Sequence, residues 1–391
     1  MTNPVTLLAG IRVVSIEQYI GAPYCTSLLA DAGAEVIKVE QPGKGDPRRD
    51  YEPRRGSGAD ALSGGFASYN RGKRSVELDL SIEAGRADLT RLLGTADVFV
   101  SNLRPGALAK LGFGRARLES DFPNLVVCEL SGFGQTGPYA QWPAFDSAIQ
   151  AMSGLASLLG DSADAPPQLA PMGTMDLLGG IYAALGILTA LVGRRSTGKG
   201  THVDASMFDI GAAFLERPLA LHEFTGEVPT RGADGFSPVG TFIAGDGKWV
   251  SVVIPTDEMW RRCCQAMNRP DLVDHHDIDT VVKRARRMRD IVLPELTRWA
   301  SDFTRDEAIS RLRDAGQPAG AVLDIGEVRR DEHLAARGLF VPVEHPEAAN
   351  ADGSLISLPR LPLLFDGLGA VPGPIPMLGE TTVDELVKAR S

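Results

Sequence analysis

The first third of the chain alternates short apolar runs with segments of helical periodicity. The runs are rich in β-branched residues, which is typical of buried strands. Strands are predicted over Ile11–Ile16, Ala34–Glu40, Lys73–Leu80, Asp97–Asn102 and Asn124–Leu130. Helices are predicted over Ala22–Ala32 and Glu83–Leu93. Apolar strands that alternate with helices predict an α/β fold with a parallel sheet covered by helices.

The middle of the chain contains its most apolar segment. A long helix is predicted from Asp176 to Arg195, glycines at 198 and 200 end it, and a strand follows over Thr201–Met207. Between Gly226 and Gly247 the composition changes to Gly, Pro and Asp, which indicates a linker and a change of domain.

Beyond this linker, Trp249–Ile254 has the pattern of a strand, and Glu258–Ala315 is rich in helical patterns. A short helix is predicted near Thr382–Ala389. A chain of 391 residues exceeds one typical core, so two domains are expected. We predict a large domain over residues 1–225, completed by residues 331–391, and a smaller domain over residues 226–330.

Composition narrows the function classes. The formal net charge of −10 argues against general nucleic-acid binding, which needs clustered Lys and Arg. The N-terminus has no signal-peptide pattern, and the 16 residues of Leu177–Val192 are short for a membrane span. Four cysteines without CxxC spacing make a disulfide framework or zinc site improbable and suggest small apolar fillers in a reducing cytoplasm.

Two glycine-rich motifs mimic nucleotide-binding loops. Gly132–Gly137 matches GxGxxG after a strand, but Pro138 and the residues after it lack the helix that a dinucleotide site requires. Gly193–Lys199 nearly matches a phosphate-binding loop, but Gly200 replaces the hydroxyl residue and a helix precedes it, so it predicts a helix end. Neither HExxH nor GxSxG occurs in the chain.

Two polar features remain as candidates for chemistry. Nine basic and five acidic residues occur between Lys38 and Arg74, a local balance of +4 that suits a small polyanion, although a solvated surface loop has the same composition. Asp176 directly precedes the apolar helix, where helix amides stabilise an anion. It is interpreted either as an ordinary helix cap or as a catalytic carboxylate with glycines beside it for close ligand approach.

A series of motifs spread over nearly the whole chain then resembles one family. The chain resembles the family III CoA transferases, a family that is also named after carnitine and bile-acid CoA transferases. The motifs that carry the resemblance are, in order, Gly33–Glu40, Gly45-Asp46, Asn70–Ser75, Asn102–Gly106, Ser131–Gly134, Phe145–Gly154, Asp176–Gly200, Val203–Met207 and Leu378–Thr381.

The resemblance implies a large Rossmann-like domain, a smaller α+β domain and a homodimer of two interlocked, ring-like subunits. It implies that Asp176 is the nucleophile and that Asp146 is a second carboxylate of the active site. The residues implied to line the CoA site are Lys38, Gln41, Lys73, Arg74, Asn102, Leu103, Arg104 and Lys110.

The implied reaction moves CoA from an acyl-CoA to a free carboxylic acid. A carboxylate nucleophile keeps the thioester energy in a mixed anhydride and an aspartyl-CoA thioester. Backbone amides at the helix start are expected to stabilise the oxyanions. No metal and no tightly bound cofactor is expected, because the CoA thioester is itself a substrate. Partners among nucleic acids and membranes are not expected.

Two alternatives stay open at this level. The α-methylacyl-CoA racemases of the same family resemble this chain at Asp176, but they have His where Phe145 stands and Glu where Pro255 stands; Asp257 or Glu258 is a candidate substitute proton carrier. A binding-only acyl-CoA protein is the non-enzyme alternative. Within transferases, the formyl-CoA type has a glycine run where Asp234–Gly240 stands and Gln where Ile20 stands, which argues against an oxalate and formate pair.

Overall fold

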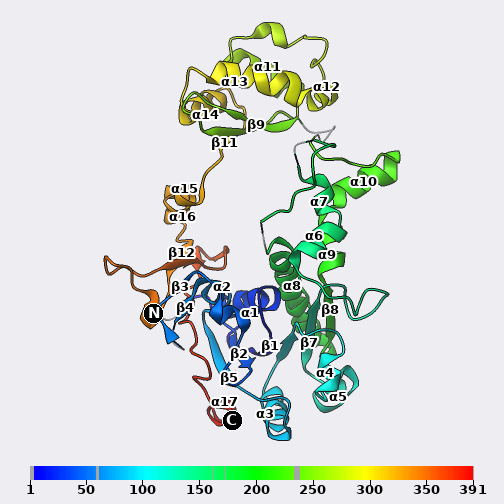
Figure 1. Ribbon diagram of the computed structural model, residues 1–391, viewed down its shortest axis with the longest axis vertical. Coiled ribbons are helices and arrows are strands. Elements are labelled where there is room, and N and C mark those ends of the chain that lie inside the picture. The colour runs from blue at the N-terminus through cyan, green and yellow to red at the C-terminus, as the bar shows by residue number, and fades with distance from the viewer. Residues whose placement is uncertain (1–3, 59–60, 161, 172, 233–237, 391) are drawn as a thin grey trace. The chain divides into compact units, whose positions relative to one another are not determined.

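The computed structural model describes residues 4–58, 61–160, 162–171, 173–232 and 238–390. The chain forms two compact units (Figure 1). The first unit consists of Met1–Ala156, Leu169–Glu216 and His333–Ser391. The second unit contains Arg217–Glu332, which encloses the predicted smaller domain, and also the short segment Ser157–Gln168, which sequence analysis placed in the large domain.

A six-stranded parallel sheet forms the centre of the first unit, in the order β5-β2-β1-β6-β7-β8. Its strands are β1 Arg12–Ile16, β2 Glu35–Glu40, β5 Lys73–Glu77, β6 Val98–Ser101, β7 Val126–Ser131 and β8 His202–Ser206. All six were predicted, with ends that differ by a few residues. The direction of winding reverses at β1, so β1 and β6 form the switch point where such sheets bind ligands at their carboxyl ends.

Helices cover this sheet, as the alternating pattern predicted (Figure 1). The helices of the first unit are α1 Gly21–Asp31, α2 Gly64–Asn70, α3 Glu83–Leu93, α4 Ala107–Lys110, α5 Arg115–Asp121, α6 Asp146–Met152, α8 Thr174–Thr197, α9 Met207–Phe214, α16 Glu332–Ala336 and α17 Val383–Lys388; α7 Leu155–Leu158 lies at its edge. Buried side chains such as Leu89, Leu92 and Phe99 join α3 to the strands. The mixed α/β class is therefore confirmed.

Short elements complete the first unit. They are the 3₁₀ helices η1 Pro47–Asp50 and η5 Pro346–Ala348 and the hairpin pairs β3 Arg54–Arg55 with β4 Leu62–Ser63, β12 Phe340–Pro342 with β13 Ser357–Pro359, and β14 Leu364–Phe365 with β15 Leu368–Gly369. The C-terminal segment returns to the sheet, where the Thr381 amide donates to the Ser75 carbonyl at 3.1 Å and α17 lies beside α3 (Figure 1).

Glycines allow α1 and α8 to pack with their backbones in close contact. A Cβ atom at Gly180 would lie 2.7 Å from the carbonyl oxygen of Gly21, so only glycine fits there. A Cβ atom at Gly21 would in turn lie 3.4 Å from Asp176 Oδ1. This packing holds the first turn of α8 beside the first turn of α1.

The start of α8 differs from the sequence prediction. The helix begins at Thr174 after Gly173, whose φ of 92° places it in the left-handed region, so Asp176 is the third helical residue and not the cap. The prediction took the nearest capping side chain in sequence, whereas the structure caps this helix from another element, as described below.

Both glycine-rich motifs have the predicted structure. The residues after Gly132–Gly137 form turns and no helix before α6, and α8 ends at Gly198 with a φ of 67°. The interpretation of Gly193–Lys199 as a helix end is confirmed, and the geometry that a dinucleotide site requires after Gly137 does not form.

Helix α8 is long and apolar enough, by length and composition, to cross a membrane, and it is the one helix of the described ranges that meets this test. Core helices of water-soluble proteins meet the same test, and 44% of its most apolar window is buried. One of its faces exposes apolar side chains at Ile181, Leu185 and Val192.

The second unit has an antiparallel sheet in the order β11-β10-β9, packed with helices around Trp260 and Leu296. Its elements are β9 Val239–Ile243, β10 Trp249–Val253, β11 Ala319–Ala321, α10 Glu216–Thr225, α11 Asp257–Ala266, η3 Pro270–Leu272, α12 Val281–Arg286, η4 Met288–Val292, α13 Leu293–Ala300, α14 Arg305–Asp314 and α15 Ile325–Arg329. All four cysteines of the protein are buried and free, as expected of apolar fillers.

Candidate active site

The loop between β1 and α1 is fixed at the carboxyl end of the sheet. Asn102, directly after β6, accepts a hydrogen bond from the Gln18 amide at 3.0 Å and donates to the Gln18 carbonyl at 2.7 Å. Both polar groups of the predicted CoA ligand Asn102 are thus used within the protein. In this structure Asn102 positions the loop.

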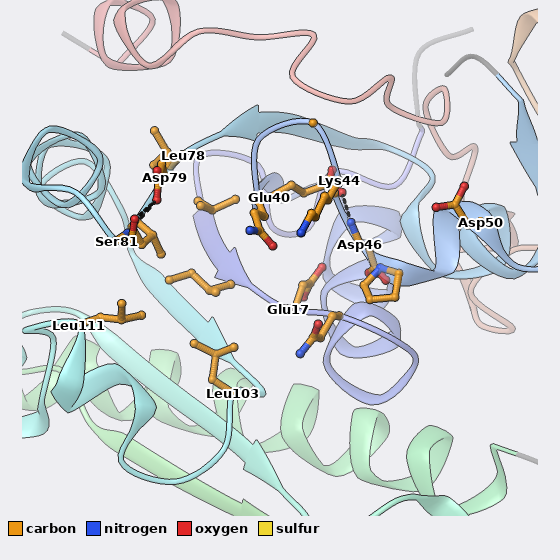
Figure 2. A pocket seen from close by; sticks show the side chains of 18 residues that line it. Glu17, Glu40, Lys44, Asp46, Asp50, Leu78, Asp79, Ser81, Leu103 and Leu111 are labelled. Atoms are coloured by element: carbon orange, nitrogen blue, oxygen red, sulfur yellow. Dashed lines mark hydrogen bonds between the residues drawn. The ribbon is translucent and has the colours of Figure 1, made fainter. Parts of the chain in front are cut away.

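A cavity of about 610 Å³ opens at the carboxyl ends of β1, β2, β5 and β6. Figure 2 shows Leu78, Leu103 and Leu111 on one side of it and Glu40, Lys44 and Asp46 on the other. Two predicted CoA-site residues, Gln41 and Leu103, line this cavity. Its place at the switch point and its mixed apolar and polar walls suit a nucleotide-like ligand.

Three exposed cations stand near this cavity. Lys44 lines it, and Arg104 and Lys110 lie in the segment around the lining residues Leu103 and Leu111. The side chains of these three residues make no hydrogen bond or ion pair with the described part of the chain. They are therefore free to meet phosphate groups.

Lys38 and Lys73 are placed differently from the prediction. Both side chains have no exposed surface; Lys38 pairs with Asp46 at 2.8 Å, and Lys73 pairs with Glu17 at 2.7 Å. Glu17 also lies 3.7 Å from Lys38. Because their ammonium groups are enclosed and already neutralised, direct phosphate contacts by Lys38 and Lys73 have no support in this structure.

Arg74, another predicted CoA-site residue, lies away from the cavity. Its guanidinium pairs with Glu35 at 3.1 Å, and Glu35 is the first residue of β2, at the opposite end of the strand from the cavity. The local charge of +4 also exceeds the positive charge that is left without a partner among the described residues. Most of those cations have carboxylate partners, among them Arg49 with Glu40 and Arg71 with Asp31.

Asp146 caps α8 from outside the helix. Its Oδ1 accepts the amide of Met175 at 2.6 Å and the amide of Asp176 at 3.3 Å, and its Oδ2 accepts Gln150 Nε2 at 2.6 Å. The structure thus brings the two predicted carboxylates together at one helix end. It also removes the Met175 and Asp176 amides as oxyanion donors, contrary to the prediction, because Asp146 already occupies them.

Asp176 is a perturbed carboxyl group. Burial, followed by the negative charge of Asp146, raises the pKa of Asp176 to about 6, and the nearby Arg48 opposes that rise. Two acidic groups held close together in a poorly solvated place cannot both ionise freely. Perturbation of this kind is typical of functional carboxylates.

Aromatic side chains lie around Arg48, whose charge acts on the Asp176 carboxylate. The guanidinium of Arg48 lies 5.3 Å from the ring centre of Tyr51 and 5.4 Å from that of Tyr69. Tyr69 in turn packs edge-on to Tyr24. Burial raises the pKa of Tyr69; the charge of Arg48 lowers it, and the charge of Asp176 raises it further. Arg48 was counted in the basic segment but not singled out, and no spacing rule predicts that it would meet Asp176.

The structure also shows the surroundings of the residues that distinguish this chain from racemases and formyl-CoA transferases. Phe145 is 65% exposed and packs edge-on to Tyr19. Asp257 is paired with the buried Arg284, and Glu258 is paired with Arg261 and Arg262. Ile20 reaches to within 3.5 Å of a Cβ built at Gly173. Part of the predicted loop Asp234–Gly240 lies outside the described residues.

No metal site was expected, but the described residues include a cluster of side chains that could hold a metal ion. In the second unit, potential ligand atoms of His275, His276 and Asp277 lie within 4.8 Å of one another. The Nδ1 atom of His275 already accepts the Asp277 amide at 3.3 Å, and His276 is exposed. No function is assigned to this cluster.

Fold and site together define a doubly wound α/β protein with two carboxylates at the start of an apolar helix and a cavity at the switch point. Residues 8–382 match CoA-transferase family III, so the chain belongs to that family. The membership expected from the motifs is confirmed.

Relatives with assigned activities agree. The chain is 33% identical over 384 residues to the succinyl-CoA–L-malate CoA-transferase alpha subunit of Chloroflexus aurantiacus, with 97% of this chain and 88% of the relative covered. It is 34% identical over 343 residues to the acetyl-CoA:oxalate CoA-transferase of Acetobacter aceti, with 85% of each covered. A crystal structure of a CAIB/BAIF family protein from Brucella suis has a TM-score of 0.85 and 28% identity over the whole of both chains.

Proposed function

We propose that this enzyme transfers CoA from an acyl-CoA donor to a carboxylic acid, with Asp176 as the covalent carrier. The observation that carries the proposal is the pair Asp176 and Asp146 at the start of α8, in a chain of CoA-transferase family III. The Asp176 carboxylate is mostly buried beside the close packing of α1 and α8, where water is scarce. Exclusion of water favours transfer over hydrolysis of an activated acyl group.

The proposed reaction begins when an Asp176 oxygen attacks the carbonyl carbon of the donor thioester. The C–S bond breaks, CoA leaves as a thiolate, and a mixed anhydride joins Asp176 to the donor acyl group. The thiolate then attacks the Asp176 carbonyl and releases the donor acid, which leaves an aspartyl-CoA thioester. The acceptor carboxylate attacks that thioester, the C–S bond breaks, CoA leaves again as a thiolate, and a second mixed anhydride joins Asp176 to the acceptor. The thiolate finally attacks the acceptor carbonyl of this anhydride, which gives the new acyl-CoA and frees the Asp176 carboxylate.

Within this proposal, Asp146 is a positioning residue. It holds the Met175 and Asp176 amides, and so the first turn of α8, and its negative charge adds to the burial that raises the Asp176 pKa. Acylation of an Asp176 oxygen neutralises its carboxylate and moves the negative charge to the CoA sulfur, so the repulsion from Asp146 is relieved when the anhydride bond forms.

The cavity at the switch point is the proposed site for the nucleotide part of CoA. Leu78, Leu103 and Leu111 offer apolar surface to the adenine, while Lys44, Arg104 and Lys110 are the free cations for the phosphates. CoA enters here as a substrate, so the proposed chemistry needs no metal or bound cofactor. Lys38 and Lys73 support the loop beneath it through Glu17 and Asp46.

The racemase alternative receives less support from the structure. Both candidate substitute proton carriers, Asp257 and Glu258, are engaged in ion pairs with arginines. A carboxylate held by an arginine is less available to exchange a proton with a substrate than a free one.

Hydroxylamine trapping tests the proposal. Wild type and Asp176→Asn are incubated with succinyl-CoA or acetyl-CoA, quenched with hydroxylamine and mapped by mass spectrometry. A hydroxamate at Asp176 in the wild type alone is expected. Loss of chirality in a 2-methylacyl-CoA without any adduct would favour the racemase, and thioester binding with neither result would leave a binding protein.

We extend the proposal to assembly and location. The exposed apolar face of α8, with Ile181, Leu185 and Val192, suits burial against a second copy in the interlocked dimer that the family resemblance implies. A cytoplasmic enzyme without membrane or nucleic-acid partners fits the charge of −10 and the four free thiols. Light scattering of the purified protein is expected to give a dimer mass, and a monomer mass would contradict this extension.

A further inference from the structure

Arg48 is a cation that makes no ion pair with a carboxylate among the described residues. It lies in η1, half-buried, and its Nε donates to the Gly65 carbonyl at 2.9 Å. Its terminal amino groups make no hydrogen bond or ion pair with the residues that the structure describes. Its neighbours Arg49 and Lys38, by contrast, are both paired with carboxylates.

The guanidinium is held in a fixed place. The rings of Tyr51 and Tyr69 lie 5.3 and 5.4 Å from it, so it is stacked as well as charged. The absence of a side chain at Gly65 makes room for it, because a Cβ there would lie 2.9 Å from one terminal nitrogen of Arg48. A cation fixed in this way is pre-organised to bind an anion.

Open space adjoins this cation. A cavity of about 510 Å³ is lined by Arg48, Gly64, Gly65 and Ser68 together with apolar residues such as Leu62 and Val343. Glu52 and Arg55 also line it; Glu52 accepts the Arg54 amide at 2.7 Å, and Arg55 donates to Asn350 and the Ala349 carbonyl. Arg48 is thus the cation of this wall whose terminal groups are unused.

We propose that Arg48 binds the distal carboxylate of a dicarboxylic acyl group while the other end reacts at Asp176. This inference rests on the proposed transfer function and specifies its substrate class. Two observations support it. Tyr69, whose ring lies 5.4 Å from the guanidinium, is acted on by the charges of both Arg48 and Asp176. The guanidinium also has two terminal nitrogens without hydrogen bonds to the described residues, the arrangement that binds a carboxylate bidentately. A monocarboxylic acyl chain would leave this charge unpaired.

Binding measurements in a variant that cannot turn over test this directly. In the Asp176→Asn background, the Kd values of succinyl-CoA and of its uncharged counterpart butyryl-CoA are measured with and without Arg48→Met. We expect a preference for succinyl-CoA of about 10- to 100-fold, the range for a hydrogen-bonded charge pair, and its loss in Arg48→Met. Because the comparison is a ratio within each protein, a general loss of folding cancels.

Two further variants sharpen the test. Gly65→Ala keeps the charge but pushes the guanidinium from its place, and we expect it to reduce the preference as well. Arg115→Met, which removes an exposed arginine paired with Glu119, is the matched control and is expected to keep the preference. A preference that survives in Arg48→Met, or its absence in the Asp176→Asn background, would overturn the inference.

The transfer proposal is tested separately by the hydroxylamine adduct. If wild type forms that adduct but the ratio does not depend on Arg48, only the inference about Arg48 fails. If no adduct forms and the Arg48-dependent preference persists, the binding inference stands and the covalent chemistry is lost.

Discussion

Two groups of charges at the same edge of the sheet have opposite properties. Under the cavity, Glu17, Lys38, Lys73 and Asp46 form a fully enclosed network in which every charge faces an opposite one. At the start of α8, Asp176 faces the like charge of Asp146, and Arg48 opposes its raised pKa without forming an ion pair with it. The first arrangement neutralises carboxylates, and the second destabilises an ionised one.

This difference distinguishes charges that support the fold from a charge that is suited to react. Burial removes the favourable hydration of both groups of charges. Only the network offsets this loss, because its charges form ion pairs. Burial lowers the pKa of Lys73 to about 8, with Glu17 opposing the fall, and the lysine keeps its charge at neutral pH. The strongest cluster of charges in the sequence is therefore mainly a scaffold, while the less conspicuous aspartate has the properties of a nucleophile.

The largest expected effect is on catalysis by Asp176. The Asp176→Asn variant removes the attacking oxygen, and we expect transfer kcat to fall by about 10³-fold or more. Steady-state assays of CoA transfer measure this. The Kd for the acyl-CoA is expected to change little, because the nucleotide cavity does not include this residue. A variant with near wild-type kcat would remove Asp176 from the mechanism.

The buried network of Glu17, Lys38, Lys73 and Asp46 is expected to stabilise the folded protein. Lys73→Met leaves Glu17 buried with a partner 3.7 Å away, and we expect a loss of about 3–5 kcal/mol in the free energy of unfolding. Arg74→Met is the matched control on the same strand, since its pair with Glu35 is partly exposed and contributes at most about 1 kcal/mol. Denaturant titrations compare the two, and equal losses would contradict a special role for the network.

Removing the charge of Asp176 is expected to change the free energy of unfolding in the opposite direction, that is, to stabilise the protein. The raised pKa means that the folded state binds a proton more tightly than the unfolded state, so stability falls as pH rises from about 4 to about 6 and stays lower above that. Asp176→Asn is therefore expected to stabilise the protein by about 2–3 kcal/mol at pH 8, a gain that disappears below about pH 4. Unfolding curves at both pH values check this, and a destabilised variant at pH 8 would refute it.

The smallest expected effect is a shift in the pH dependence of kcat/KM when Asp146 is changed. An ionised Asp176 is needed for attack, so the acid limb of kcat/KM is expected near pH 6. Asp146→Asn keeps an oxygen to accept the Met175 amide but removes the negative charge, so the acid limb is expected to move to lower pH. Asp146→Ala is the comparison, because it also loses the helix cap and about 1 kcal/mol of stability. An unmoved limb in Asp146→Asn would show that Asp146 acts through geometry alone.

Much of the fold could be predicted because it is written in local patterns. The apolar runs at β1, β2 and β7 and the glycine at the end of α8 are decided by side chains within a few residues. Family motifs supplied Asp176 and Asp146, whose meeting at one helix end agrees with their predicted shared site. Exposure could not be predicted: Lys38 and Lys73 look like phosphate ligands until their carboxylate partners are known.

The sequence by itself determined the α/β class, the family and the presence of a carboxylate at the start of an apolar helix, because each depends on residue type and spacing. Tertiary structure decided which charges are available. Glu17 meets Lys73 across 56 positions of the chain, and Asp146 reaches α8 across 29, so pairing and desolvation arise only when distant segments pack. It also placed Arg48 beside two tyrosines and a glycine, which gives a single arginine of a basic segment its proposed role.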